Sequence, residues 1–324
     1  MRAETMLKAA TGLVFGAVVL AGGWLVWRER WGFSSDAVFR VPGEQISREL
    51  LPNLRGARVV VPDRPHRADE ARSAAGRGSV TRRRSFLLDT ERHGFRGAVD
   101  VSDVPAGPRV LLVGDSIALG WGVSEEQSLA RQLSAALGAE VIDAAVPGLT
   151  AAEVVVRARL WAERLHPDRV VLAMRSRAGT DDVAALCAGA RGISGVALLF
   201  HPASTFALDA APASPPPDCG APWLDLTPTF RAALPMPGVI LERDGSAQVL
   251  LRFPGREELL RAAGGAGDRL ADEVIAAFEA DPSLREPLFY DGVHPDEAGY
   301  ALYARTAATW LSTTAAAGGP GHSP

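Results

Sequence analysis

The sequence predicts an α/β fold of three layers (α/β/α), in which helices cover both faces of a mainly parallel sheet. Between residues 109 and 200, short apolar runs typical of strands alternate with longer runs of helical periodicity. Strands that alternate with helices pair in parallel through right-handed crossovers. With 324 residues, of which 47% are apolar and 22% charged, the chain has enough apolar material to bury such a core.

The predicted elements follow one another at short intervals. Strands are expected at 110–113, 140–144, 169–174, 195–200 and 223–226, and helices at 126–137, 151–165, 181–190, 256–280 and 296–310. Two apolar runs flank the Asp-Gly turn at 244–245, which predicts a hairpin inserted near 236–253. Ahead of the sheet we expect one short strand at 59–61 and a solvated loop around the basic run 82–84.

These elements divide the chain into four parts. Residues 32–108 are rich in Arg, Pro and Gly and show no long apolar period, so they predict an irregular extension that packs on the main domain. The α/β domain is expected at 109–313. A tail and transmembrane anchor at 1–31 precede the extension, and a disordered tail at 314–324 follows the domain.

The segment 9–27 contains no charged residue and is flanked by basic residues on both sides. About 20 apolar residues cross a bilayer, so the segment predicts one N-terminal transmembrane helix. A cleaved signal peptide is the alternative, since residues 21–23 are small, but the apolar run continues to Trp27 and favours a retained anchor. N-terminal apolar segments commonly act as export signals, so we expect a membrane protein whose bulk is extracytoplasmic. Three tryptophans that favour the membrane interface cluster at the carboxyl end of the apolar run: Trp24, Trp27 and Trp31.

Charge and composition argue against several classes of ligand. The net charge is only −4 and no basic run is interleaved with aromatic residues, so the sequence predicts no nucleic-acid partner. No phosphate-binding glycine loop follows a predicted strand, and the six histidines are scattered, so neither a cofactor nor a metal is expected. The chain has two cysteines, Cys187 and Cys219, which are too few for a disulfide framework. The sequence leaves open whether they form a bridge with each other or remain free thiols.

The strand at 110–113 leads directly into Gly114, Asp115 and Ser116. The glycine permits a sharp turn that places the serine hydroxyl just beyond the carboxyl end of the strand. Open α/β sheets carry their chemistry at this edge. The alternative is an ordinary strand exit in which Ser116 caps the following helix.

Asp291 and His294 stand three residues apart on a loop before the final helix. A serine nucleophile needs a base to take its proton, and the base works best when a carboxylate holds its ring. On its own, the run 291–295 is typical of a turn followed by a helix that begins with proline. Together with Ser116, however, these residues make up a nucleophile, a base and an orienting acid.

These blocks resemble those of the SGNH or GDSL-type esterases and lipases, over residues 89–310. The segment 89–97 is similar to a stretch found in membrane-anchored bacterial members of that family. The resemblance implies an SGNH-hydrolase-like, flavodoxin-like sheet. The matching positions are Gly114, Asp115 and Ser116 for the first block, 141–148 for the second, and 291–295 for the last.

The resemblance also implies acyl-ester chemistry. Ser116 would attack the carbonyl carbon, His294 would act as base and then as acid, and Asp291 would orient His294. The backbone N–H groups of Ser116 and Gly148 would face the oxyanion. The expected substrate is an acyl or acetyl ester on a cell-envelope carbohydrate or lipid. The alternatives are an O-acetyltransferase that uses the same triad and a catalytically impaired binding or assembly module.

The chain departs from the third block of that family, Gly-x-Asn-Asp, in which the Asn donates to the oxyanion. The Asn position falls on Asp181, whose ionised carboxylate cannot donate a hydrogen bond. Arg175, Ser176 or Arg177 would then supply the third donor, and a guanidinium is an effective charge-assisted one. The alternatives are a salt-bridged surface loop and a loss of activity. The second block likewise has Asp143 and Ala145 where an Asn and a Gly are common.

Overall fold

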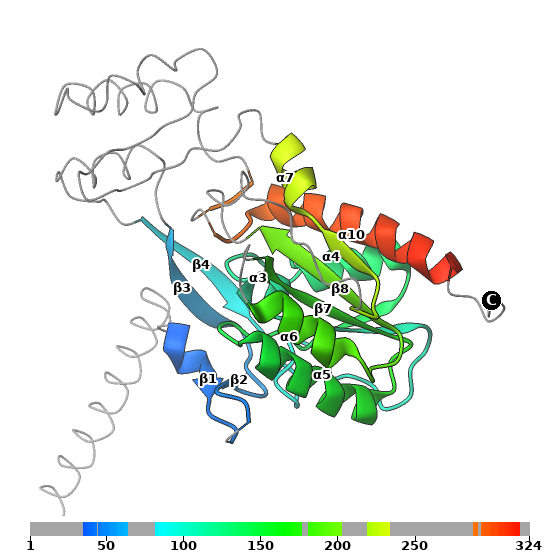
Figure 1. Cartoon of the computed structure of the whole chain (residues 1–324). Helices are drawn as coiled ribbons and strands as arrows, with labels where there is room; N and C mark the ends of the chain where they lie inside the picture. The colour runs from blue at the N-terminus through cyan, green and yellow to red at the C-terminus, as the bar shows by residue number, and fades with distance from the viewer. Residues whose placement is uncertain are drawn as a thin grey trace, which may run out of the picture.

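The computed structural model describes residues 35–43, 45–63, 82–176, 181–202, 219–233, 288–290 and 293–317. The central sheet of these residues has five strands, paired in parallel in the order β6-β5-β7-β8-β9 (Figure 1). Each strand lies where the apolar pattern predicts one, so the mainly parallel sheet is confirmed. The strands are β5 (Arg109–Gly114), β6 (Glu140–Asp143), β7 (Arg169–Ser176), β8 (Val196–Pro202) and β9 (Trp223–Asp225).

Helices cover both faces of this sheet. Val110 and Leu112 of β5 belong to the same core as two helices, α4 (Leu129–Leu137) and α10 (Glu297–Ala317). Leu111 and Val113 belong to the core on the opposite face, with α5 (Ala151–Leu165) and α6 (Asp181–Ala190). The alternation follows from the strand period of two and produces the three predicted layers. Two shorter helices are α3 (Ser116–Leu119), which follows β5, and α7 (Thr227–Ala233), which follows β9.

The N-terminal extension contains the strand expected at 59–61, within β3, and further regular structure that its composition did not predict. A short 3-10 helix (Ser35–Val38) precedes the strand pair β1 (Phe39–Arg40) and β2 (Glu49–Leu50), and β3 (Ala57–Asp63) pairs antiparallel with β4 (Arg82–Leu88). Every second residue of the longer pair is buried, among them Val59 and Phe86, while Leu87 is 57% exposed. Arginines at the neighbouring positions of β4 hide this period of two in the sequence.

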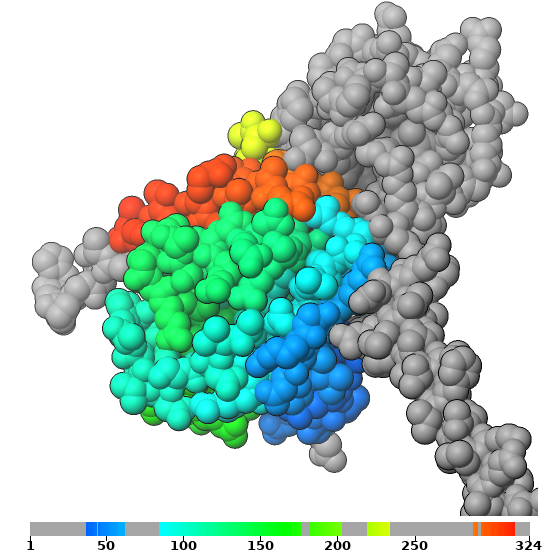
Figure 2. Space-filling view, turned by 180° about the vertical axis from the view of Figure 1, so that it is seen from behind, coloured from blue at the N-terminus to red at the C-terminus, as the bar shows by residue number. Residues whose placement is uncertain are grey.

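Buried polar contacts tie this extension to the α/β domain. Glu49 of β2 forms an ion pair of 2.7 Å with the fully buried Arg157 of α5, which also donates to the carbonyl oxygen of Ala144. Arg96 donates from its guanidinium to the carbonyl oxygens of three residues around the end of α3: Leu119, Gly120 and Val123. Removing one partner of a buried ion pair typically costs about 3 to 5 kcal/mol. The extension is therefore held as part of the domain; Figure 2 shows it, in blue to cyan, reaching the orange start of α10.

Asp143, the last residue of β6, is buried, and this burial raises its pKa to about 8 against the opposing pull of Arg96. Between about pH 4 and pH 8 the unfolded carboxyl ionises while the folded one keeps its proton. The free energy of unfolding should therefore fall as pH rises through this window, by up to about 1.4 kcal/mol per pH unit. Asp143→Asn removes the titration, so we expect the variant to gain stability over the wild type from pH 5 to pH 8.

Urea unfolding of both proteins at several pH values across that window measures this difference. Because the amide oxygen of the variant can still accept from the backbone N–H of Ala145, as the carboxylate does at 3.2 Å, the local turn is retained. A constant difference in the free energy of unfolding between the two proteins would contradict a protonated Asp143.

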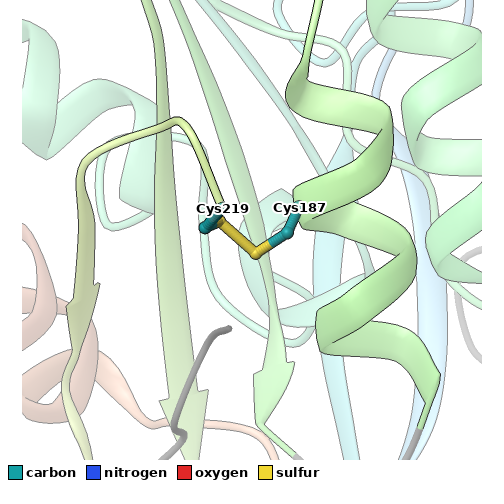
Figure 3. The surroundings of a disulfide bond; sticks show 2 residues. All are labelled: Cys187 and Cys219. Atoms are coloured by element: carbon teal, nitrogen blue, oxygen red, sulfur yellow. A yellow bond between two sulfur atoms is a disulfide. The ribbon is translucent and has the colours of Figure 1, made fainter. Parts of the chain in front are cut away.

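A disulfide joins Cys187 of α6 to Cys219, which lies ahead of β9 (Figure 3). The Cα atoms are 4.6 Å apart, and the bridge closes a loop between residues separated by 32 positions. A cross-link over such a loop typically stabilises a domain by about 3 kcal/mol, mainly by restricting the unfolded chain. We expect Cys187→Ser to lower the free energy of unfolding by this amount, measured by urea denaturation. Reducing the wild type should have the same effect, and an unchanged midpoint in both experiments would contradict it.

Several predicted features lie outside the described residues: the transmembrane segment 9–27, the inserted hairpin near 236–253, the helix 256–280, and Asp291. None of the helices in the described part of the chain is long and apolar enough to cross a membrane. Helix α10 runs to Ala317 and so enters the tail that was expected to be disordered from residue 314. The hydroxyl of Thr314 bonds back to the carbonyl oxygens of the preceding turn, and alanine, the best helix former, follows it.

Candidate functional site

The first part of the site is the turn that joins β5 to α3. A Cβ on Gly114 would lie 2.1 Å from the carbonyl oxygen of Ala173 in β7, so only glycine fits here. The next residue, Asp115, is the N-cap of α3: its Oδ1 accepts from the backbone N–H groups of Ile117 at 2.9 Å and Ala118 at 3.4 Å. The alternative in which Ser116 caps the helix is therefore wrong. Because Asp115 takes this task, the Ser116 hydroxyl is left for another partner.

That partner is His294, which lies 178 residues later in the chain. His294 Nε2 is 2.9 Å from Ser116 Oγ, a normal hydrogen-bond distance. A base needs this reach, and a neutral Nε2 would accept the proton of the serine hydroxyl. The structure thus brings together two of the three predicted catalytic side chains, and the third, Asp291, lies outside the described residues.

The loop that carries His294 is closed by backbone hydrogen bonds and by ring packing. The N–H of Tyr290 donates to the carbonyl oxygen of His294 at 3.0 Å, and the two rings stack at 15° with their centroids 5.7 Å apart. Gly122 has φ +89, and a Cβ there would lie 2.4 Å from the Tyr290 ring. The glycine thus lets the tyrosine lie directly against the loop after α3, where its hydroxyl donates to the carbonyl oxygen of Trp121 at 3.3 Å.

Arg84 of β4 supports the same loop from the extension. Its Nε donates to the carbonyl oxygen of Gly122 at 2.6 Å, and its guanidinium lies 4.9 Å from the centre of the Tyr290 ring. It also forms an ion pair with Glu297 at the start of α10. The basic run 82–84 was expected to be a solvated loop, and nothing in its sequence distinguishes Arg84 from its neighbours. Only the pairing of β3 with β4 directs this side chain toward the site.

A buried polar cluster lies at the carboxyl ends of β5, β7 and β8. Asp115 Oδ2 is 3.3 Å from Arg175 Nε and 3.4 Å from His201 Nε2, and His201 Nδ1 is 3.2 Å from the hydroxyl of Tyr303. Burial alone would raise the pKa of Asp115, but His201, Arg175 and the N–H of Ile117 outweigh it and lower this pKa to about 2. Asp115 is therefore an anion, fixed between the turn that carries Ser116 and two further strands.

Of the residues considered for the third oxyanion donor, Arg175 is the one whose side chain the structure describes, and Arg177 lies outside the described residues. It pairs in register with His201 on the neighbouring strand, its Nε faces Asp115, and its side chain is 31% exposed. The backbone places Ser176 at the end of β7 and Asp181 at the start of α6. The sequence did not identify His201 or Tyr303 as site residues, because His201 has the local pattern of an ordinary strand residue and Tyr303 that of an ordinary helix residue.

The loop after β6 supplies the remaining predicted residue, Gly148. The N–H of Val146 donates to the carbonyl oxygen of Gly114 at 3.0 Å, so this loop leaves the sheet beside the turn that carries Ser116. Gly148 has φ +82, a left-handed conformation that glycine adopts at little cost. The loops that carry Ser116 and Gly148 thus lie side by side at one edge of the sheet.

Comparison with known proteins places this site in a family. The family model of GDSL-like lipases and acylhydrolases matches residues 112–302, more than half of the chain. No curated protein matches the sequence.

Solved structures that match include a lipase/acylhydrolase from Enterococcus faecalis, with 18% identity, 64% of this chain and 97% of that chain covered, and a TM-score of 0.34. A GDSL-like lipase from Bacteroides thetaiotaomicron has 16% identity, covers 64% and 88%, and has a TM-score of 0.29. A catalytic mutant of an acetylxylan esterase from Geobacillus stearothermophilus has 14% identity, covers 65% and 96%, and has a TM-score of 0.30. By the family match, which spans both the Gly-Asp-Ser turn and His294, the chain belongs to the GDSL-like lipase/acylhydrolase family, with the SGNH-hydrolase fold.

Proposed function

We propose that this protein is a serine ester hydrolase whose nucleophile is Ser116 and whose base is His294. The observation that carries the proposal is the 2.9 Å distance between Ser116 Oγ and His294 Nε2. The membership of the acylhydrolase family supports it, since that family suggests ester hydrolysis. Asp291 completes the proposed triad as the carboxylate that orients the imidazole and stabilises its charged form.

In the proposed reaction, Ser116 Oγ attacks the acyl carbon while His294 takes the hydroxyl proton. The tetrahedral intermediate collapses when His294 returns that proton to the leaving alkoxide, and an acyl-serine remains. Water then attacks the acyl carbon and gives a proton to His294, which passes that proton to Ser116 Oγ as the bond to the acyl carbon breaks and the carboxylic acid leaves. His294 is regenerated at the end of each step, and the proposed reaction uses no cofactor.

The oxyanion would be stabilised by the backbone N–H groups of Ser116 and Gly148 and by the guanidinium of Arg175. Arg175 is supported as the third donor because its Nε is anchored on Asp115, which leaves its terminal nitrogens for another acceptor. A guanidinium cannot lose its proton at neutral pH, so the charge would be present throughout the reaction. This donor takes the place of the Asn that the family motif has at this step.

We propose that the protein acts outside the cytoplasm, held by the apolar segment 9–27, on an acyl or acetyl ester of an envelope carbohydrate or lipid. The bridge between Cys187 and Cys219 supports export, because disulfides persist in oxidising compartments. In intact cells that express the full chain, both cysteines should resist alkylation and the chain should sediment with membranes. Free thiols or a chain released without detergent would contradict this location.

The test of the activity uses the full-length chain with 4-nitrophenyl acetate and with a fluorophosphonate probe. We expect hydrolysis above the buffer rate and one covalent phosphonyl adduct, which mass spectrometry assigns to Ser116. The matched control is Ser116→Ala, which should show neither. Absence of both hydrolysis and labelling in the wild type would refute the proposal. Acetyl transfer to an added oligosaccharide that exceeds hydrolysis would instead assign an acetyltransferase.

A further inference from the structure

We propose that Arg48 makes this site selective for esters that carry an anionic group, such as a carboxylate, close to the scissile bond. The inference rests on the proposed function, since it concerns the substrate of the same site. Arg48 lies just before β2 in the N-terminal extension, outside the segment that the family model matches. It would be a specificity-determining residue that takes no part in the bond-making steps.

The first observation is the position of the guanidinium against Gly148. A Cβ built on Gly148 would lie 3.4 Å from Nη1 and 3.5 Å from Cζ of Arg48, which is van der Waals contact. The backbone N–H of Val146 donates to the carbonyl oxygen of Gly114 at 3.0 Å. Gly148 follows Val146 by two residues, just as Ser116 follows Gly114 by two residues. The guanidinium of Arg48 therefore lies against the loop of Gly148, which is next to the turn that carries Ser116.

The second observation leads to the same place through aromatic rings. The Arg48 guanidinium lies 5.2 Å from the centre of the Phe39 ring, and Phe39 stacks on Trp121 at 6.0 Å and 22°. The backbone N–H of Trp121 donates to the carbonyl oxygen of Ser116 at 3.0 Å. A cation held over an aromatic face loses little further freedom when it binds an anion. This series of contacts thus joins the Arg48 guanidinium to the turn that carries Ser116.

The third observation is the balance of charge. The other arginines at this edge face a carboxylate: Arg175 faces Asp115, Arg84 faces Glu297, and Arg157 faces Glu49. Within the described residues, no acidic side chain forms an ion pair with Arg48, although the side chain is half-buried. A guanidinium presents paired N–H donors that match a carboxylate or phosphate, so a substrate anion is the partner that its chemistry favours.

The experiment compares matched pairs of esters that differ only in charge. On the leaving-group side the pair is 4-acetoxybenzoate and its methyl ester, and on the acyl side it is the 4-nitrophenyl monoester of adipic acid and its methyl ester. We expect the full-length wild type to prefer the anionic member of at least one pair by about 10- to 100-fold in kcat/KM, as for a charge-assisted hydrogen bond. The pair that shows the preference tells on which side of the scissile bond the anion lies.

The variants are Arg48→Ala and Arg48→Lys, with Arg92→Ala as the matched control. Arg48→Ala should abolish the preference and leave the neutral esters within about twofold, whereas lysine should keep part of it as a point charge. Arg92 is an exposed arginine of the same extension, paired with Asp103, so its loss changes the net charge equally and should leave the preference intact. High salt should weaken the preference in the wild type.

Each negative result of this experiment leads to a different conclusion. Hydrolysis of the neutral esters without a preference for the anions would overturn the role of Arg48 and leave the proposed function standing. An equal loss on neutral and anionic esters in Arg48→Ala would also overturn it, because a structural residue would behave so. If the wild type hydrolyses none of the four esters and Ser116 is not labelled, the proposed function fails and this inference falls with it.

Discussion

Replacing Ser116 or His294 by alanine is expected to lower kcat for 4-nitrophenyl acetate by about 10³- to 10⁴-fold, and replacing both should lower it no further. The two side chains share one proton across a distance of 2.9 Å, so they work as one unit. Once the nucleophile is gone the base has nothing to activate, and the reverse holds as well. Members of such a unit give strongly non-additive losses.

The measurement is kcat for the wild type, the two single variants and the double variant, each with its thermal midpoint. Ser116 and His294 both lie at the edge of the core and are partly exposed, so unchanged midpoints are expected. His166→Asn is the matched control, since it replaces an exposed histidine at the C-terminal end of α5 that has a left-handed conformation suited to asparagine. A double variant whose loss equals the product of the single losses would show that the pair does not act together.

Arg175→Met is expected to lower kcat by about 100-fold with little change in KM, as the loss of one oxyanion donor does. The donor strengthens only as charge develops on the carbonyl oxygen, so its effect falls on the transition state. The same substitution leaves Asp115, which is fully buried, without the guanidinium that faces it at 3.3 Å. Arg175→Met should therefore also lower the free energy of unfolding.

A double-mutant cycle separates the catalytic role of Arg175 from its structural role. Asp115→Asn removes the buried charge and so should restore much of the stability that Arg175→Met loses. If Arg175 donates to the oxyanion, the double variant remains slow although it is stable. Recovery of kcat in the double variant would mean that Arg175 serves only to balance Asp115. Arg131→Ala is the control for charge, because Arg131 is 59% exposed and pairs with Glu125 on the surface.

Arg84 and Asp115 show how the site depends on residues outside the reacting groups. Asp115 caps α3 and also faces Arg175, so one buried carboxylate sets both the nucleophile turn and the proposed third donor. Arg84 joins Gly122, Tyr290 and Glu297, and thereby holds the loop of His294 from the side of the extension. Through these contacts of Arg84, the extension supports the loop that carries His294, the proposed base.

The parallel α/β sheet could be predicted from the sequence because apolar period and strand length are properties of consecutive residues. The Gly-Asp-Ser turn could be located in the same way, but the need for glycine at position 114 comes from a contact with Ala173 of the neighbouring strand β7. The same locality explains one failure: the three consecutive arginines at 82–84 concealed the start of β4, a strand that buries Phe86 and Leu88 on one face. Ser116 was linked to His294 in the sequence by their places, after the first sheet strand and before the last helix, and the resemblance to a family supported that link.

Only the tertiary structure decided which distant side chains meet. The distance from Ser116 to His294, the bridge between Cys187 and Cys219, and the contact of Arg48 with Gly148 all join segments that are far apart in the chain. Such contacts depend on how whole layers pack, and a single arginine or histidine has the same local appearance whether it faces solvent or a buried carboxylate. The choice of Asp115 over Ser116 as the helix cap is a local contact by contrast, and it depends on the extended backbone of Asp115 at the end of β5.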